Sequence, residues 1–214
     1  MQMLLEYRRD PISRELETIR HKHSMLHLDV LMLIYHFAKM SARPILEIGS
    51  YLGGATIAGA WGMRDSGRRR PFLSIEVGGQ CEHPRLPTKN ILKDLKKNLA
   101  RRGVSDFVTL IEGSSRDQKV IAAVMEKLQP GTVGLLIIDA DGNVKSNIEL
   151  YGALLSENCW MVIDDYYAPA IGSKDVFVRP QINSMVDAGQ LETLGFYGWA
   201  TWVGRWRGSQ RTAS

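Results

Sequence analysis

Hydrophobic and polar positions change their spacing along this chain in a regular order, and that order predicts an α/β fold. Short apolar runs that suit strands alternate with longer stretches in which apolar residues recur at helical spacing. The run at 133–138 is apolar throughout, as expected of a parallel strand covered on both faces. From residue 44 onward we expect strands at 45–48, 71–76, 107–111, 133–138 and 160–163, and helices at about 88–102, 115–128, 144–155 and within 175–189.

The two ends of the chain depart from this alternation. Before the first predicted strand, a core-facing stripe recurs at helical spacing, formed by Leu26, Val30, Leu33, Ile34 and Phe37. Near the other end, two strand-like runs lie within 191–206, and residues 207–214 form a polar tail. We therefore divide the chain into an N-terminal helical segment (1–43), one α/β domain (44–206) and the tail.

Composition fits a globular protein of a reducing compartment. The chain has 214 residues, of which 44% are hydrophobic, which is enough for one domain with a full core. No apolar run approaches the roughly 18 residues that a membrane span needs, and the first ten residues lack the apolar core of a secretory signal. The two cysteines are too few for a disulfide scaffold. We expect a cytoplasmic protein without membrane contact.

The charge is mildly basic, at +4 with a pI of about 9.1. Such a charge helps a protein bind polyanions without requiring that it does so. The densest basic run, Arg68–Arg70, stands just before a predicted strand and favours a solvated loop over a nucleic-acid contact. We therefore do not expect a nucleic-acid partner.

The most informative stretch is 45–56, Ile-Leu-Glu-Ile-Gly-Ser-Tyr-Leu-Gly-Gly-Ala-Thr. An apolar strand is followed by a glycine-containing loop and by small residues that open a helix, and open α/β sheets bind ligands at such a place. We expect Gly49 and Gly53 to allow a close approach to a ligand, because glycine has no Cβ. The two glycines are four apart and Tyr51 lies between them, so the G-x-G-x-x-G pattern of dinucleotide sites is absent.

Acidic residues end three further predicted strands. Glu76 ends the strand at 71–76, where a carboxylate can accept hydrogen bonds from both hydroxyls of a ribose. Asp139 and Asp141 follow the strand at 133–138, and Asp164 and Asp165 follow the next one. Carboxylates that meet at one edge of a sheet repel one another unless a cation or protons intervene. Mg²⁺ prefers such oxygen ligands, although a single aspartate could also bind substrate or cofactor without metal.

The pattern Glu47-x-Gly49-x-x-x-Gly53-x-x-Thr56 resembles the first motif of Rossmann-like S-adenosylmethionine-dependent methyltransferases. The stretch Gly-Ser-Tyr-Leu-Gly-Gly is similar to that of the catechol and caffeoyl-CoA O-methyltransferases. The resemblance implies a three-layer sandwich whose seven-stranded, mostly parallel sheet is completed by a C-terminal antiparallel pair. It also implies a set of cofactor-binding residues, namely Glu47, Gly49, Ser50, Tyr51, Gly53, Thr56, Glu76, Ser115, Arg116 and Asp139.

Ser115 and Arg116 enter this set because Gly113–Asp117 resembles the Gly-x-Ser-x-Asp stretch that contacts adenine in catechol O-methyltransferases. A serine at this place also suits a helix N-cap, and the two roles are compatible. The segment before the first strand caps the cofactor and substrate pocket in the same family, so we expect residues 1–43 to act as a lid.

By the same resemblance the metal ligands are Asp139, Asp164 and Asp165, although the family has Asn at the last position. Asp139 is then also catalytic. The family often has a lysine three residues after the first metal aspartate, where this chain has Gly142. Lys145 remains as a candidate general base, against a solvated lysine on a helix.

These features together predict an S-adenosylmethionine-dependent O-methyltransferase, assisted by Mg²⁺ or another divalent cation, that acts on a small hydroxylated molecule. The alternatives are a metal-independent N- or RNA methyltransferase and a cofactor-binding protein without catalysis. A homodimer is compatible with the sequence.

Overall fold

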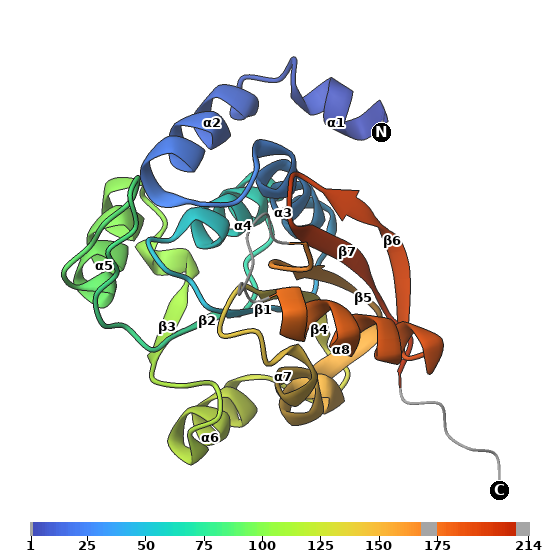
Figure 1. Ribbon diagram of the computed structural model, residues 1–214. Helices are drawn as coiled ribbons and strands as arrows, with labels where there is room; N and C mark the ends of the chain where they lie inside the picture. The colour runs from blue at the N-terminus through green and yellow to red at the C-terminus, as the bar shows by residue number, and fades with distance from the viewer. Residues whose placement is uncertain (1, 168–174, 209–214) are drawn as a thin grey trace, which may run out of the picture.

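The chain folds around a seven-stranded sheet with helices on both faces, as a computed structural model describes for residues 2–167 and 175–208 (Figure 1). The strand order is β3-β2-β1-β4-β5-β7-β6, with β7 antiparallel to β5 and β6 antiparallel to β7. This confirms the predicted Rossmann-like sandwich with its C-terminal antiparallel pair. The strands are β1 (Ile45–Ile48), β2 (Phe72–Glu76), β3 (Thr109–Glu112), β4 (Val133–Ile138), β5 (Leu155–Ile163), β6 (Leu191–Tyr197) and β7 (Thr201–Trp206).

Two apolar cores lie on opposite faces of the sheet, because successive side chains of each strand point to opposite sides. In β4, Leu135 and Ile137 belong to one core, and Leu136 and Ile138 to the other. Helices on the first face are α2 (Ile12–His23), α3 (Leu28–Met40), α4 (Gly54–Asp65) and α5 (Ile91–Arg101). Helices on the second face are α6 (Gln118–Lys127), α7 (Val144–Tyr151) and α8 (Asp175–Asp187).

The connection from α7 to β5 differs from the sequence prediction. The helix expected to reach residue 155 ends at Tyr151, followed by a 3-10 turn at Gly152–Leu154, and β5 already begins at Leu155. Leu154 and Leu155 are buried against the second core, so apolar residues that continued the helical pattern serve the turn and the strand instead.

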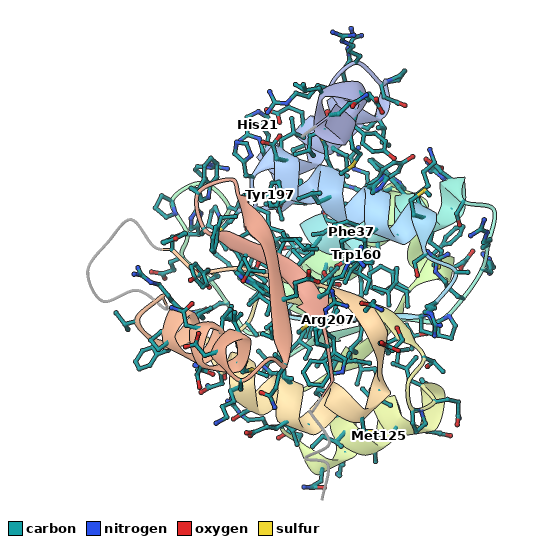
Figure 2. The ribbon with its side chains drawn as sticks, turned by 90° about the vertical axis from the view of Figure 1, so that its right-hand side faces the viewer. His21, Phe37, Met125, Trp160, Tyr197 and Arg207 are labelled. Atoms are coloured by element: carbon teal, nitrogen blue, oxygen red, sulfur yellow. The ribbon has the colours of Figure 1, made fainter. Side chains whose placement is uncertain are left out.

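Aromatic residues of the C-terminal half tie the sheet to the N-terminal helices. The ring of Trp160 in β5 stacks on Phe37 of α3, with the ring centroids 4.1 Å apart (Figure 2). The Arg205 guanidinium lies 4.1 Å from the centroid of the Trp160 ring. Trp202 and Trp206 are buried in the second core. These three tryptophans therefore pack within the fold.

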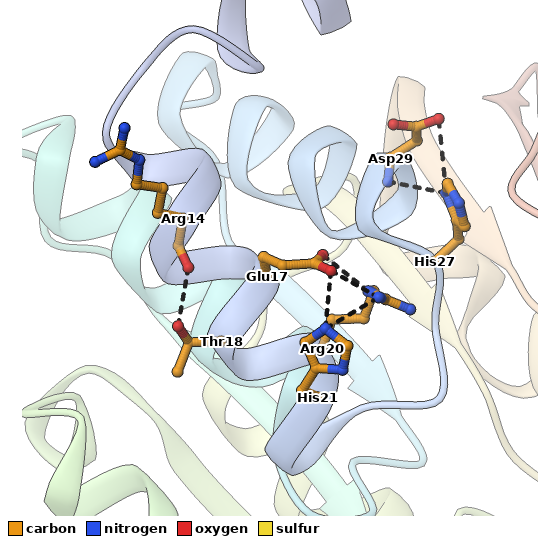
Figure 3. A network of polar contacts seen from close by, with 7 residues as sticks. All are labelled: Arg14, Glu17, Thr18, Arg20, His21, His27 and Asp29. Carbon is orange, nitrogen blue, oxygen red and sulfur yellow. Dashed lines mark hydrogen bonds and ion pairs between the residues drawn. The ribbon is translucent and has the colours of Figure 1, made fainter.

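The N-terminal segment contains two kinds of structure. Helix α3 is a full part of the first helical layer and packs along α4, whereas α1 (Gln2–Tyr7) and α2 lie over that layer (Figure 1). Helix α2 is amphipathic: Leu16 and Ile19 are buried, and Glu17 on the polar face pairs with Arg20 and His21 (Figure 3). None of the described helices combines the length and the hydropathy needed to cross a bilayer.

The turn between α2 and α3 covers the start of α4. A Cβ atom on Gly54, the first residue of α4, would lie 2.5 Å from Ser24 Oγ and 3.0 Å from the His23 carbonyl oxygen. His27 then caps α3 by accepting the Asp29 backbone N–H through Nδ1 at 3.2 Å (Figure 3). The N-terminal segment thus lies directly on the loop that the sequence assigns to the cofactor, while its action as a lid remains a prediction.

Candidate active site

A cavity of about 460 Å³ opens at the carboxyl ends of β1, β2, β3 and β4. Small-molecule sites in proteins occupy about 300–1,000 Å³, so a cofactor-sized ligand fits this volume. Six of the predicted cofactor residues line the cavity, namely Gly49, Tyr51, Glu76, Ser115, Arg116 and Asp139. The cavity lies where the parallel strands end, which is the usual ligand position in open α/β sheets.

Glycines in the loop after β1 make close contacts within the protein, and Gly49 also lines the cavity, so its close approach to a ligand stays a prediction. Gly49 has φ +89°, and a Cβ there would lie 2.6 Å from the carbonyl carbon of Asp139 and closer still to its oxygen. Gly53 has φ +93°, and its Cβ would lie 2.9 Å from Leu95 Cδ1 on α5. Gly49 therefore allows the loops after β1 and β4 to touch, which joins the cofactor loop to the predicted metal site.

A buried polar network supports this loop from behind. The Glu47 carboxyl is fully buried and accepts hydrogen bonds through Oε2 from Thr56 Oγ1 at 2.7 Å and Ser74 Oγ at 2.6 Å. The Ser50 hydroxyl joins the network through Ser74. Burial raises the pKa of Glu47 to about 7, against the two hydrogen bonds that lower it. Glu47, Ser50 and Thr56 thus shape the loop and do not line the cavity.

Glu76 is anchored to the same loop from the cavity side. Its Oε2 accepts the backbone N–H groups of Ser50 at 2.9 Å and Tyr51 at 2.7 Å, and its Oε1 accepts that of Gly78 at 2.8 Å. A carboxylate offers roughly four lone-pair sites, so about one is left for a ligand. The sequence suggested that Glu76 could accept both hydroxyls of a ribose; with these backbone bonds intact, it has capacity for one.

The loop at 77–90 forms a wall of the cavity that sequence reasoning missed. Gly78, Gln80 and Cys81 line the cavity, and Cys81 pairs with Thr88 in an isolated bridge. The Tyr51 hydroxyl donates to the Leu86 carbonyl and so ties this loop to the one after β1. Burial and the neighbouring Cys81 raise the pKa of Tyr51. The sequence signal for its place in the cavity wall is that the loop follows a predicted parallel strand, where ligands bind in open α/β sheets.

The loop after β3 is held by α7 and does not cap α6 through Ser115. The N-cap residue of α6 is Asp117, while Ser115 Oγ donates to Asn147 Oδ1 at 2.7 Å. The Tyr151 hydroxyl donates to the Ser115 carbonyl at 2.6 Å. The alternative of a Ser115 helix cap is therefore wrong, because α6 begins later than the sequence suggested.

Arg116 and Asp141 form an ion pair of 2.6 Å at the cavity, between the loops after β3 and β4. Burial alone would raise the pKa of Asp141, but hydrogen bonds from Asn143 and the Arg116 guanidinium bring it below its ordinary value. The Asp141 carboxylate is thus paired with the Arg116 guanidinium, and Asp141 does not belong to the group formed by the other strand-end aspartates.

Asp139, Asp164 and Asp165 lie together as the sequence reasoning expected. Each offers one carboxylate oxygen, and the three oxygens lie within 4.8 Å of one another. Ligand oxygens on opposite sides of one Mg²⁺ ion, each about 2.1 Å from it, are about 4.2 Å apart. The spread of these oxygens is close to that value, so the cluster fits a shared hard cation after small side-chain adjustments. Asp139 also lines the cavity, so the cluster adjoins it.

Lys145, in the first turn of α7, does not line the cavity. Its ammonium group is 3.9 Å from a Glu149 carboxylate oxygen, with both side chains more than half exposed. Its backbone N–H donates to Gln181 Oε1 of α8 at 2.8 Å. The structure therefore gives no support to Lys145 as a general base, because its exposed ammonium group pairs with Glu149 of the same helix and the residue does not line the cavity.

Comparisons with known proteins identify the family of this chain. A methyltransferase-domain family matches residues 46–166, which is more than half of the chain. The chain belongs to this family, and the predicted class of enzyme, a methyltransferase, is confirmed. No curated protein matches the sequence.

Solved structures of O-methyltransferases share the fold. One from Bacillus cereus, in complex with SAH, is 16% identical, with a TM-score of 0.65 and coverage of 97% of this chain and 91% of that one. TomG from Streptomyces achromogenes, in complex with SAM, is also 16% identical, with a TM-score of 0.65 and coverage of 93% and 91%. A candidate caffeoyl-CoA O-methyltransferase from Staphylococcus aureus is 19% identical, with a TM-score of 0.66 and coverage of 95% of each chain. At these identities the likeness establishes the fold.

Proposed function

We propose that the protein transfers a methyl group from S-adenosylmethionine to a hydroxyl of a small molecule, with Mg²⁺ or another divalent cation held by Asp139, Asp164 and Asp165. The observation that carries the proposal is the position of Asp139, which belongs both to the cavity wall and to the carboxylate cluster. A cofactor in the cavity and a cation on the cluster would therefore meet at one residue.

The residues of the cavity fit this cofactor in three places. Glu76 retains capacity for a ribose hydroxyl after its three backbone hydrogen bonds. Gly113, Ser114 and Arg116 also line the cavity, and we place the adenine ring beside them. Gly49 and Tyr51 line it as well, and because Gly49 lies against the backbone of Asp139, we place the methionine part there.

When bound, S-adenosylmethionine supplies an electrophilic methyl group, and a cation on the carboxylates supplies positive charge that lowers the pKa of the acceptor hydroxyl. The protein itself contributes by fixing the positions of the groups that would hold the two reactants. Asp139 is fixed by its backbone N–H, which donates to the Ile48 carbonyl at 2.9 Å, so the loop after β4 keeps its distance from the loop after β1. Such fixed placement of the two reactants is a major part of catalysis in displacement reactions.

The direct test is a screen of hydroxylated small molecules for SAH release, with Mg²⁺ and with EDTA. We expect release that needs both an acceptor and the cation. The double variant Asp164→Ala/Asp165→Ala should lose cation-dependent turnover and keep its affinity for S-adenosylmethionine in calorimetry. As a matched control, Asp141→Ala removes an acid of the same edge outside the cluster and should keep the Mg²⁺ requirement at saturating cofactor.

Two results would count against the proposal in different ways. Turnover that persists in EDTA would remove the cation from the mechanism and leave methyl transfer intact. Failure to bind S-adenosylmethionine would remove the proposed methyl donor altogether.

A further inference from the structure

The start of β7 lies beside the acidic pair that follows β5. The two strands are antiparallel, with Ile163 opposite Trp202, so the register brings Asp164 opposite Thr201. The Ala200 carbonyl accepts the backbone N–H groups of Tyr166 at 2.8 Å and Tyr167 at 3.2 Å. The chain just after the acidic pair is therefore anchored to the residue that precedes β7, which is remote from it in the sequence.

Thr201 contacts the pair directly. Its hydroxyl donates to Asp164 Oδ1 at 2.5 Å, and the residue is only 2% exposed. Hydrogen bonds from a hydroxyl to a carboxylate are among the strong ones and fall in this distance range. The threonine side chain is restricted at χ1 because it is branched at Cβ, which limits the positions that its hydroxyl oxygen can take. The main chain of Asp164 is fixed separately, since its N–H donates to the Ile138 carbonyl at 3.0 Å.

The neighbouring Asp165 has a left-handed backbone, with φ +62°. Such a conformation is costly for residues other than glycine and persists where the surroundings enforce it. The anchoring of Tyr166 and Tyr167 to Ala200 supplies that enforcement. Strand β7 thus holds Asp165 through the main chain and Asp164 through the Thr201 side chain.

We propose that Thr201 is a positioning residue that aims the Asp164 carboxylate at the cation site, an inference that rests on the proposed metal-assisted function. With Oδ1 bound to Thr201, rotation of the carboxylate about its side-chain bonds is restricted, and its other oxygen is kept in a fixed direction. Groups that orient metal ligands in this way affect metal affinity by about 10–100-fold when removed.

The test is calorimetric titration of Mn²⁺ into the 214-residue protein and its variants in the presence of S-adenosylmethionine. Thr201→Val keeps the shape and removes the donor, and we expect its Mn²⁺ affinity to fall by about tenfold or more. Thr201→Ser keeps the donor and should bind Mn²⁺ nearly as the unaltered protein does. Affinity for S-adenosylmethionine without metal should be the same in all three.

Ser156→Ala is the matched control for loss of a buried hydroxyl. Ser156 lies at the opposite end of β5, and its Oγ donates to the Val133 carbonyl at 2.8 Å. This variant should keep its Mn²⁺ affinity even where thermal unfolding shows some loss of stability. If Thr201→Val does not fold, Thr201→Ala gives the same comparison without the added methyl group.

Each result is decisive. Weakened Mn²⁺ binding in Thr201→Val, with recovery in Thr201→Ser, supports the proposal. Equal Mn²⁺ affinity in Thr201→Val and the unaltered protein overturns it while leaving the metal site in place. Absence of Mn²⁺ binding in the unaltered protein overturns the metal-assisted function, and the role of Thr201 with it.

Discussion

Replacement of Gly49 by alanine should destabilise the protein through two separable effects. The residue has φ +89°, and a left-handed backbone costs a residue with a Cβ about 1–2 kcal/mol. The new Cβ would also lie 2.6 Å from the carbonyl carbon of Asp139, so the loops after β1 and β4 must separate. Overpacking of this kind costs about 1–3 kcal/mol. The sum is about 2–5 kcal/mol, a large part of the roughly 5–15 kcal/mol that keeps a typical domain folded.

Gly67→Ala separates the two effects. Gly67 also has a positive φ, of +67°, but a Cβ there would meet no atom within 4 Å. It should therefore lose only the backbone contribution, about 1–2 kcal/mol. Urea unfolding measures both losses, and calorimetry with S-adenosylmethionine should show impaired binding in Gly49→Ala alone. Equal losses of stability in the two variants would refute the close contact between the loops.

Further variants test other parts of the site. Burial raises the pKa of Glu47 from its ordinary 4.5 to about 7. Between these two pH values the folded state keeps a proton that the unfolded state has lost. The free energy of unfolding should therefore fall by about 3 kcal/mol as the pH rises from 4.5 to 7, and then level off. In Glu47→Gln this fall should be absent from unfolding curves measured at several pH values, and parallel curves for the two proteins would exclude the raised pKa. Asp165→Asn should fold normally and keep a metal ligand, because asparagine tolerates φ +62°. In Asp165→Ala the free energy of unfolding in urea should fall by about 1–2 kcal/mol, and Mn²⁺ should bind more weakly. Equal behaviour of both variants would contradict this account of the turn. Lys145→Ala should change the turnover number by less than about twofold, because Lys145 does not line the cavity and its exposed ammonium group pairs with Glu149. A tenfold or greater loss would return Lys145 to the mechanism.

Much of the fold could be predicted because each strand has a local signature. The run at 133–138 is apolar throughout and coincides with β4, and a strand buried on both faces permits little else. The proximity of the acids after β4 and β5 could also be predicted, because neighbouring parallel strands end at the same edge of the sheet. Sequence order and sheet topology thus bring three or four acids to this edge, and the resemblance to the catechol-type family selects Asp139, Asp164 and Asp165 among them.

Other features depend on contacts that no local pattern encodes. Thr201 reaches Asp164 only because β7 returns antiparallel beside β5. Gly49 is required by the backbone of Asp139, a residue far along the chain, while the motif alone suggested a ligand. Lys145 lies six residues after Asp139, where the family has its lysine three residues after, and its ammonium group pairs with Glu149 of the same helix.

The central claim is that the bound methyl group and the carboxylate cluster meet at Asp139. The most direct measurement is the NMR signal of S-adenosylmethionine labelled with ¹³C at its methyl group, bound to the protein and titrated with paramagnetic Mn²⁺. We expect strong broadening in the unaltered protein, and none in the Asp164→Ala/Asp165→Ala variant or when Mg²⁺ replaces Mn²⁺. A sharp methyl signal at saturating Mn²⁺, with the cofactor fully bound, would contradict the account.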